Sequence, residues 1–230
     1  MCNNLTVIAH IESVFPQKFG VPRQSGLVDV QAKIIFEPEY RIKEAFRGLE
    51  EYSYIWLLWG FSQNTSDEWS PTVRPPKLGG NKRMGVFATR SPFRPNSIGL
   101  SSVRLVKIDF DSLFGPVLLV NGADLTDGTP IYDVKPYLPY TDSHPDARGG
   151  FSLDGEKAKI KVDFPPKLAE KIAPEYRNPL LKVLEQDPHP AYKNDKNRVY
   201  YMQFSSYEIG FTASDGVLTV CSVDKLTKNC

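Results

Sequence analysis

RPPKLGGNKRMGVFATRSPFRPNSIGL, residues 74–100, is the stretch around which the chain is organised. Residues 70–108 hold eight lysines and arginines but no acid, although an even spread of the chain's 27 acids would place about four or five there. The stretch is also rich in proline, which fixes φ, and in glycine, which permits conformations that other residues avoid. This composition predicts a shaped loop that accepts an anion, rather than a solvated helix face.

The positive charge of the chain is local. The formal net charge is +1, so the residues outside this window are net negative by about seven charges. Such a distribution favours a polyanionic partner held at one place over nonspecific binding to nucleic acid. A chain of 230 residues, 41% of them hydrophobic, is typical of a soluble globular protein that needs no disulfide or metal to hold its core.

Several classes of protein are disfavoured by what the sequence lacks. The cysteines, Cys2, Cys221 and Cys230, form no close pair, which favours reduced thiols in the cytoplasm. There is no signal-peptide pattern and no run of 18 apolar residues, so we expect a soluble protein with no membrane partner. The three histidines lie far apart and predict no metal site. No glycine fingerprint, Walker loop or zinc-hydrolase motif is present, which disfavours Rossmann cofactor chemistry and P-loop phosphoryl transfer.

Hydrophobic patterns predict a mainly β first half. Residues 41–52 have apolar residues at helical spacing, and residues 53–61 form an apolar run that predicts a strand buried on both faces. Strands are predicted at residues 5–12, 27–36, 53–61, 84–88, 98–110 and 116–120. Because these strands do not alternate regularly with helices, they predict an antiparallel closed sheet or barrel rather than a doubly wound sheet.

The rest of the chain predicts a small second domain. Residues 142–156 have the polar, glycine-rich composition of a linker, which predicts domains at residues 1–145 and 146–230. The second domain is predicted to be α+β, with a strand at 157–164, helices at 165–173 and 175–186, and three strands within 199–223. The polar segment at 186–198 suits either an exposed loop or a second contact with a long substrate.

Three polar segments each allow two interpretations. Arg23 and Gln24 follow Pro22 and form either an exposed turn or part of a site. Ser62 and Gln63 either cap the strand that precedes them or face a site. The pair at residues 127–128 is either an ordinary hairpin turn or a functional acidic turn.

Five segments carry a resemblance to a known family. They are VPRQSGL (21–27), RGLEEYSYIWLLWGF (47–61), RPPKLGGNKRMGVFATRSPFRPNSIGLS (74–101), DLTDGTPIYDVKPYLPY (124–140) and QDPHPAY (186–192). In this order they resemble the TsaA-like, TrmO-type tRNA methyltransferases, and they span nearly the whole chain. The resemblance implies S-adenosylmethionine-dependent methylation of N6 of N6-threonylcarbamoyladenosine beside the anticodon of a tRNA.

The same resemblance implies a fold and a cofactor site. The fold is a compact antiparallel β-barrel that binds S-adenosylmethionine without a Rossmann fold, usually in a homodimer. Carried over position by position, the cofactor residues are Pro22, Arg23, Gln24, Ser62, Gln63, Arg90, Leu100, Asp124, Leu125, Thr126 and Asp127. Arginine suits the cofactor's carboxylate, and a carboxylate suits its ribose hydroxyls.

Roles toward the substrate are hypotheses on the same basis. The expected phosphate contacts are Lys77, Lys82, Arg83, Arg94 and Lys135. Asp127 or Asp133 is the candidate base, and Tyr137 or Tyr140 is the candidate support for the modified adenine, although these tyrosines equally suit a barrel core.

The chain departs from many relatives at three positions, where it has Ser62 for histidine, Ser97 for proline and His189 for arginine. An essential imidazole at position 62 is therefore excluded. Two other functions remain as alternatives to tRNA methylation. One is a noncatalytic RNA-binding module, and the other is a methyltransferase that acts on a small molecule.

Overall fold

The structure is a computed structural model that describes residues 5–63, 68–75, 78, 82–151, 160–189 and 198–226. The chain divides into two compact units. The barrel unit comprises Met1–Val14, Arg23–Val73 and Met84–Asp146, and the C-terminal unit comprises Phe15–Pro22, Arg74–Arg83 and Ala147–Cys230. Within the described residues, no helix has the length and apolar character that crossing a membrane requires.

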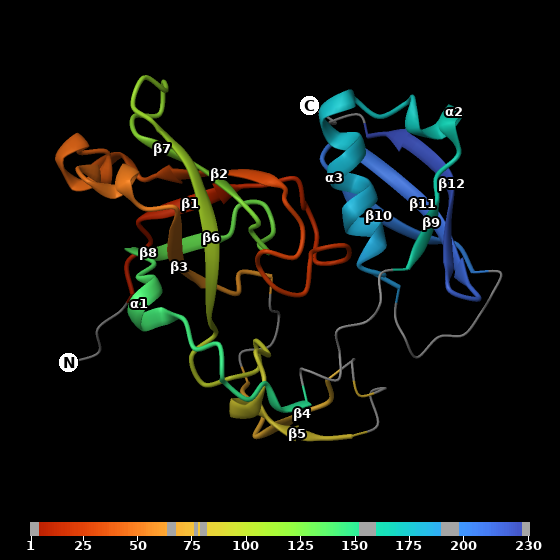
Figure 1. Ribbon diagram of the computed structural model, residues 1–230, viewed down its shortest axis with the longest axis horizontal. Helices are drawn as coiled ribbons and strands as arrows, with labels where there is room; N and C mark the ends of the chain where they lie inside the picture. Colours follow the sequence, from red (N-terminus) through yellow and green to blue (C-terminus); the bar gives the residue numbers. More distant parts are fainter. Residues whose placement is uncertain are drawn as a thin grey trace. The chain divides into compact units, whose positions relative to one another are not determined.

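Six antiparallel strands close into a barrel in the first unit (Figure 1). Their order around the barrel is β1 (Ala9–Glu12), β2 (Gln31–Phe36), β7 (Val117–Asn121), β6 (Ile98–Asp109), β3 (Tyr54–Gly60) and β8 (Pro130–Pro136). The prediction of a mainly β, antiparallel barrel is confirmed. The sequence interpretation missed β8, because prolines begin and end this strand and polar residues occupy its middle.

Alternation along the strands fills the barrel interior. In β2, Ala32, Ile34 and Phe36 are buried, while the residues between them are exposed or half-buried. Ile55 and Leu57 of β3 are fully buried within the same core. In β6, Gly99, Ser101 and Val103 are buried while the residues between them are exposed or half-buried, as expected for a strand with one face in the core.

Two predictions about this unit were wrong in detail. The helix predicted at 41–52 is replaced by short 3-10 segments at Pro38–Tyr40, Lys43–Phe46 and Leu49–Glu51. Gly48 has a φ of 86°, which no right-handed helix accommodates, so the chain turns there. Strand β3 is buried on one face only, because Tyr54, Trp56 and Leu58 point outward and are exposed or half-buried.

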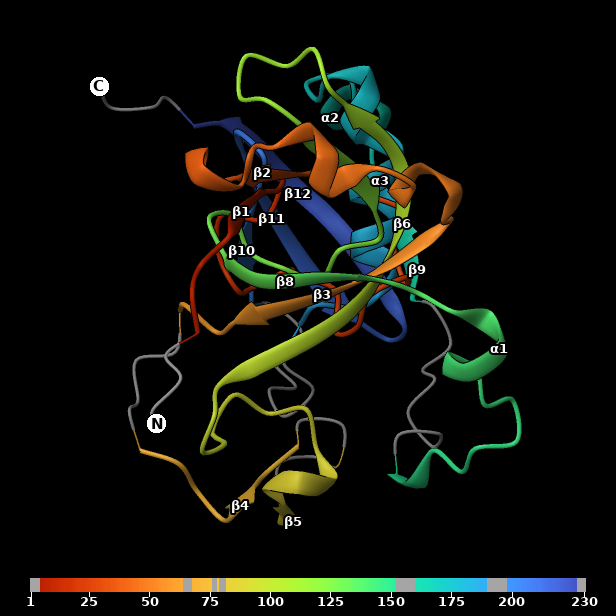
Figure 2. The ribbon, with the colours of Figure 1, turned by 90° about the vertical axis from the view of Figure 1, so that its left-hand side faces the viewer.

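A small lobe follows the barrel strand β3 in sequence. Strands β4 (Thr72–Val73) and β5 (Met84–Gly85) pair as an antiparallel hairpin, and a 3-10 turn at Val86–Ala88 follows. Figures 1 and 2 both place this hairpin beyond the first residues of β6. A single helical turn, α1 (Pro139–Asp142), lies after β8.

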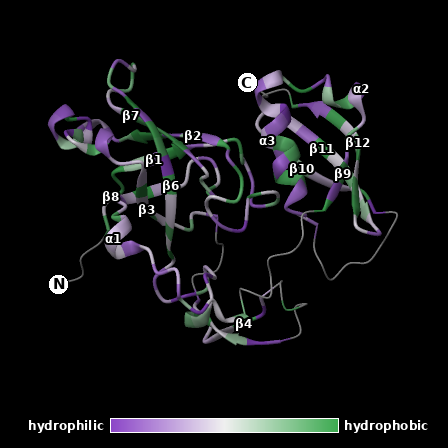
Figure 3. Ribbon diagram, viewed as in Figure 1, coloured by the Kyte–Doolittle hydropathy of each residue, from purple (hydrophilic) through white to green (hydrophobic). Residues whose placement is uncertain are grey.

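The C-terminal unit is a sheet with helices, as predicted. The sheet has the order β10 (Tyr200–Phe204), β11 (Tyr207–Ser214), β12 (Val217–Lys225) and β9 (Lys161–Asp163), with β9 parallel to β12. The helices are α2 (Pro166–Ala169) and the amphipathic α3 (Pro174–Glu185), whose ribbon carries both colours in Figure 3. Phe15 joins this unit, and its ring lies edge-on to that of Phe204 at 5.9 Å.

Candidate active site

Arg90 and Gln24 meet at the edge of the barrel unit. Arg90 follows the 3-10 turn at Val86–Ala88, and its Nη1 donates a hydrogen bond to Gln24 Oε1. Gln24 Nε2 donates to the backbone oxygen of Arg23 at 2.5 Å. The guanidinium of Arg90 is exposed, and it keeps further N–H groups in a planar fork that matches a carboxylate. Gln24 and Arg90, which the resemblance places in one site, therefore lie in contact, together with the backbone oxygen of Arg23.

Asp124 lies at the end of a hydrogen-bonded chain that starts in the barrel core. The indole Nε1 of Trp59 donates to Ser101 Oγ at 3.0 Å, and that hydroxyl donates to Asp124 Oδ1 at 2.6 Å. Burial raises the pKa of Asp124 above its ordinary value of 3.8, while the hydrogen bond from Ser101 and the charge of Arg90 act in the opposite direction. The half-buried carboxylate therefore lies under the electrostatic influence of Arg90.

The raised pKa of Asp124 gives the first testable prediction. Well below pH 3.8 the carboxyl is protonated in the folded and the unfolded protein, so its burial costs nothing extra. As the pH rises from there through the raised pKa, the folded wild type loses stability relative to Asp124→Asn, and the loss persists above it. Urea unfolding of both proteins between about pH 3.5 and 7.5 measures this difference. A difference that is constant with pH, or that changes in the wild type's favour, would contradict the burial of this carboxylate.

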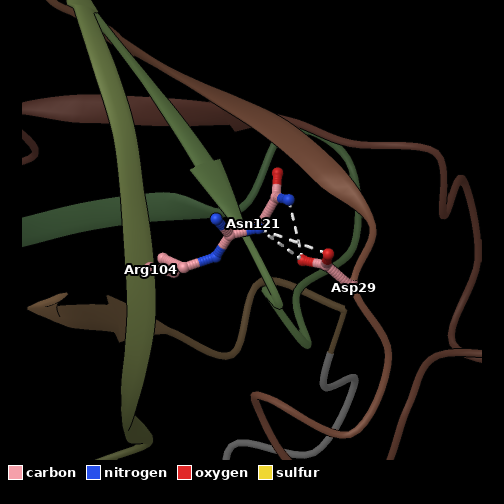
Figure 4. Close-up of polar contacts among 3 residues, drawn as sticks. All are labelled: Asp29, Arg104 and Asn121. Atoms are coloured by element: carbon pink, nitrogen blue, oxygen red, sulfur yellow. Dashed lines mark hydrogen bonds and ion pairs between the residues drawn. The ribbon is translucent and has the colours of Figure 1, made fainter. Parts of the chain in front are cut away.

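A polar cluster holds the segment that carries Arg23 and Gln24. Asn121 Nδ2 donates to Asp29 Oδ1 at 2.7 Å, and Arg104 Nη2 lies 3.2 Å from the same oxygen (Figure 4). The sequence interpretation missed this cluster, because its three residues lie on three different parts of the chain. In the sequence they are only one acid and two possible hydrogen-bond donors far apart along the chain, and such combinations are too common to predict a contact.

Two glycines bring the neighbouring backbones into direct contact. Gly26 N donates to the backbone oxygen of Gly122 at 2.8 Å, and Gly122 N donates to the backbone oxygen of Val30 at 3.1 Å. Both glycines have positive φ, and a Cβ on Gly122 would lie 3.3 Å from the Cα of Gly26. The loop with Gln24 is thereby fixed to the turn that leads into Asp124.

The remaining residues of the acidic turn are held by strand β1 and its extension. Ser13 Oγ donates to the oxygen of Leu125, and Ser13 N donates to Asp127 Oδ1, both at 2.9 Å. Thr126 and Thr129 hydroxyls lie 3.0 Å apart across the turn. Leu125 is buried, whereas Asp127 is exposed. The turn is thus a tight connection that also presents one carboxylate to solvent.

Ser62 lines a shallow depression of about 340 Å³ at the end of β3. Its other lining residues are Leu5, Gly60, Phe61, Pro95, Asn96, Ser97, Ile98, Pro130 and Tyr132. The hydroxyl of Tyr132 lies directly over Gly60, where an added Cβ would be only 2.3 Å away. Gln63 follows Ser62 in sequence, and Leu100 points outward from β6 with 51% of its surface exposed. Pro22 belongs to the C-terminal unit.

The cations expected at tRNA phosphate have different surroundings. Arg94 Nη1 donates to the backbone oxygens of Thr89 at 3.1 Å and Ser91 at 3.5 Å, so this side chain also fixes its own loop. Lys135 Nζ lies 2.9 Å from Asp133 Oδ2. Lys82 and Arg83 are exposed in the C-terminal unit, and Lys77 lies outside the described residues.

The tyrosines after β8 lie outside the barrel core. The ring of Tyr137 lies 5.6 Å from that of Trp56 and 6.2 Å from that of Tyr54, and Tyr140 is 86% exposed. Asp142 accepts hydrogen bonds from the backbone N of Leu138 at 3.0 Å and from Trp56 Nε1 at 2.8 Å, and these bonds lower the pKa of Asp142. This outer face of β3 and β8 is aromatic and accessible. In the described part of the chain, no cluster of three His, Cys, Asp or Glu side chains is arranged for a metal ion.

Comparison with known families accounts for both units. The model of the tRNA-methyltransferase O N-terminal domain matches residues 10–143, and the TrmO C-terminal domain model matches residues 157–226. Together they cover most of the chain.

Known proteins resemble the chain over three quarters or more of its length. A tRNA (adenine(37)-N6)-methyltransferase of Escherichia coli is 39% identical over 94% of this chain and 96% of its own. A protein of the same description from Eikenella corrodens is 41% identical over 75% of this chain and 97% of its own. A crystal structure of TrmO from Pseudomonas aeruginosa superposes with a TM-score of 0.78 at 30% identity, and covers 98% of both chains.

Proposed function

Because the chain belongs to the tRNA-methyltransferase O family, we propose that it methylates N6 of N6-threonylcarbamoyladenosine beside the anticodon of tRNA, with S-adenosylmethionine as donor. The observation that carries the proposal is the grouping of Gln24, Arg90 and Asp124 at one edge of the barrel. These residues come from three separate segments that share the family resemblance, and their chemistry suits this cofactor.

The residues present fit S-adenosylmethionine. Arg90 offers a planar cation for the carboxylate, and Asp124 offers an acceptor for ribose hydroxyls. The neighbouring backbone groups at residues 23–26 and 124–127 suit the edge of an adenine. When bound, the cofactor supplies an electrophilic methyl group on a sulfonium centre.

The protein's main tasks are then to position the acceptor nitrogen and to provide for the removal of its proton. The acceptor nitrogen must lie in line with the methyl group at about 3–3.5 Å, and it must lose its proton as the new bond forms. Tyr137 and Tyr140 are accessible and suit stacking against the modified adenine. Exposed cations at Lys82 and Arg83 suit phosphate.

Asp127 is the better placed of the two candidate bases. It lies in the same turn as Asp124 and is exposed, with one oxygen accepting a hydrogen bond from Ser13 N, whereas the carboxylate of Asp133 pairs with the cation of Lys135 at 2.9 Å. We expect Asp127→Asn to slow single-turnover methyl transfer at saturating cofactor by about 100-fold or more. Asp133→Asn is the matched control and is expected to keep the wild-type rate. Full single-turnover rate in Asp127→Asn would eliminate it as the base.

Binding measurements separate the proposal from its alternatives. Calorimetry should detect S-adenosylmethionine binding, which a noncatalytic RNA-binding module would lack. Affinity for tRNA should fall steeply with added salt, because phosphate contacts release counterions. A methyltransferase for a small molecule would bind its substrate with no such dependence on salt.

The proposal also includes a cytoplasmic location and a homodimer. The exposed, free thiol of Cys221 suits a reducing compartment. Exposed apolar residues of β6, such as Ile98 and Val106, suit contact with a second copy. Sedimentation equilibrium measures the mass of the assembly and tests the homodimer.

A further inference from the structure

The lobe of the barrel unit at residues 68–73 and 84–97, here called the aromatic lobe, exposes every aromatic residue that it contains. Trp69 is 52% exposed, Phe87 is 73% exposed and Phe93 is 40% exposed. Phenylalanine and tryptophan are usually buried in large part, so three exposed rings in one small lobe are unusual for a surface that contacts only water.

The backbone of the aromatic lobe is tied together at several points. Ser70 N donates to the oxygen of Phe93 at 3.1 Å, and Val86 N donates to the oxygen of Pro71 at 3.0 Å. The pairing of Thr72 with Gly85 adds the β4–β5 hairpin between these contacts. The first bond joins the residue after Trp69 to Phe93, and the second is made by Val86, the residue that precedes Phe87. The three rings are therefore mounted on one hydrogen-bonded frame.

The charge of the aromatic lobe selects the chemistry of its partner. The described residues of the lobe hold one acid, Glu68 at its start, and two arginines, Arg90 and Arg94, which lie close in sequence to Phe87 and Phe93. Exposed rings interleaved with arginines match single-stranded RNA, whose unpaired bases stack on aromatic side chains while phosphates pair with cations.

We propose that the aromatic lobe binds unpaired nucleotides of the substrate RNA, with Phe87 as the main stacking platform and Phe93 and Trp69 beside it. Arg94 contacts an adjacent phosphate. The inference rests on the proposed function, because that function makes the RNA a tRNA whose anticodon loop presents unpaired bases. It adds a base-stacking surface to the cluster of Gln24, Arg90 and Asp124, with which the lobe shares Arg90.

Substitutions at Phe87 test stacking directly, since its exposed ring can be removed without opening the core. The probe is a fluorescein-labelled anticodon stem-loop that carries N6-threonylcarbamoyladenosine, with affinity measured by fluorescence anisotropy. Phe87→Ala and Phe87→Leu are expected to weaken binding by about 5-fold or more, and Phe87→Tyr to stay within about 2-fold of wild type. The leucine variant keeps an apolar side chain but has no π face.

Salt dependence separates stacking from charge. Phe87→Ala should leave the slope of log K against log[salt] unchanged, whereas Arg94→Ala should reduce its magnitude by about 0.7, the value for one phosphate contact on a single strand. Wild-type affinity in Phe87→Ala, or equal affinity in Phe87→Leu and wild type, would overturn the stacking proposal. A lower self-association mass in Phe87→Ala would also overturn it, since the lobe would then be an interface between copies.

The outcomes also separate this inference from the proposed function. If wild type methylates the stem-loop while Phe87→Ala binds it as tightly, the stacking proposal fails alone. If wild type binds the stem-loop through Phe87 but transfers no methyl group, the proposed function fails alone. Circular dichroism and cofactor calorimetry on each variant confirm that the barrel is intact.

Discussion

We expect Gly99→Ala to destabilise the barrel and to abolish measurable cofactor binding. A Cβ at position 99 would lie 2.2 Å from the ring of Trp59, which is only 8% exposed and has little room to move. Overpacking of this kind costs about 1–3 kcal/mol of unfolding free energy, and the rigid, buried indole of Trp59 places this case at the upper end. Displacement of Trp59 would also break its hydrogen bond to Ser101, which in turn orients Asp124.

The measurement for Gly99→Ala combines urea unfolding with calorimetry of S-adenosylmethionine binding. Gly85→Ala is the matched control, because a Cβ there meets nothing within 4 Å and the expected change is small. A Gly99→Ala protein with wild-type stability and cofactor affinity would show that the chain from Trp59 to Asp124 does not support the site.

Arg90→Ala is expected to weaken S-adenosylmethionine binding by at least about tenfold with little change in stability. A hydrogen bond to a charged group contributes about 1.5–3 kcal/mol, and Arg90 is the cation that meets Gln24 at the site. Arg90→Lys should recover only part of the affinity, since lysine keeps the charge but lacks the planar fork. Calorimetry at one fixed salt concentration measures all three proteins.

Arg47→Ala is the control for Arg90→Ala. Arg47 is an exposed arginine of the same unit, and it lies between the 3-10 segments Lys43–Phe46 and Leu49–Glu51 rather than at the site. Its replacement tests whether the loss of any one positive charge weakens binding. Unchanged affinity in Arg90→Ala, or an equal loss in Arg47→Ala, would remove Arg90 from the cofactor site.

Strand periodicity made the barrel predictable, but local backbone chemistry was harder to anticipate. Strands such as β2 bury alternate residues, and this pattern is visible in the sequence. Strand β8 escaped notice because Pro130 and Pro136 read as breakers, although they occupy its first and last positions, where proline is tolerated. At residues 41–52 the apolar spacing suits a helix, yet the positive φ of Gly48 prevents one continuous helix from forming there.

The contacts of the candidate site depend on strand register, which the sequence does not reveal. Ser101 reaches Asp124 only because β6 places Ser101 on the inner face while Leu100 points out. The cluster of Asp29, Arg104 and Asn121 likewise joins residues that are up to 92 positions apart. The individual residues of the cofactor site were predicted from the family resemblance and not from the sequence pattern, and their roles stay predictions that binding measurements test.

Transfer of a labelled methyl group to a defined nucleoside tests the proposed function most directly. The protein is incubated with methyl-labelled S-adenosylmethionine and with tRNA that either carries or lacks the threonylcarbamoyl group, and the tRNA is then digested and its nucleosides separated. We predict label only in the N6-methylated form of N6-threonylcarbamoyladenosine, and only in tRNA that carries the group. Label in another nucleoside, or no label in the modified tRNA, would contradict the proposal.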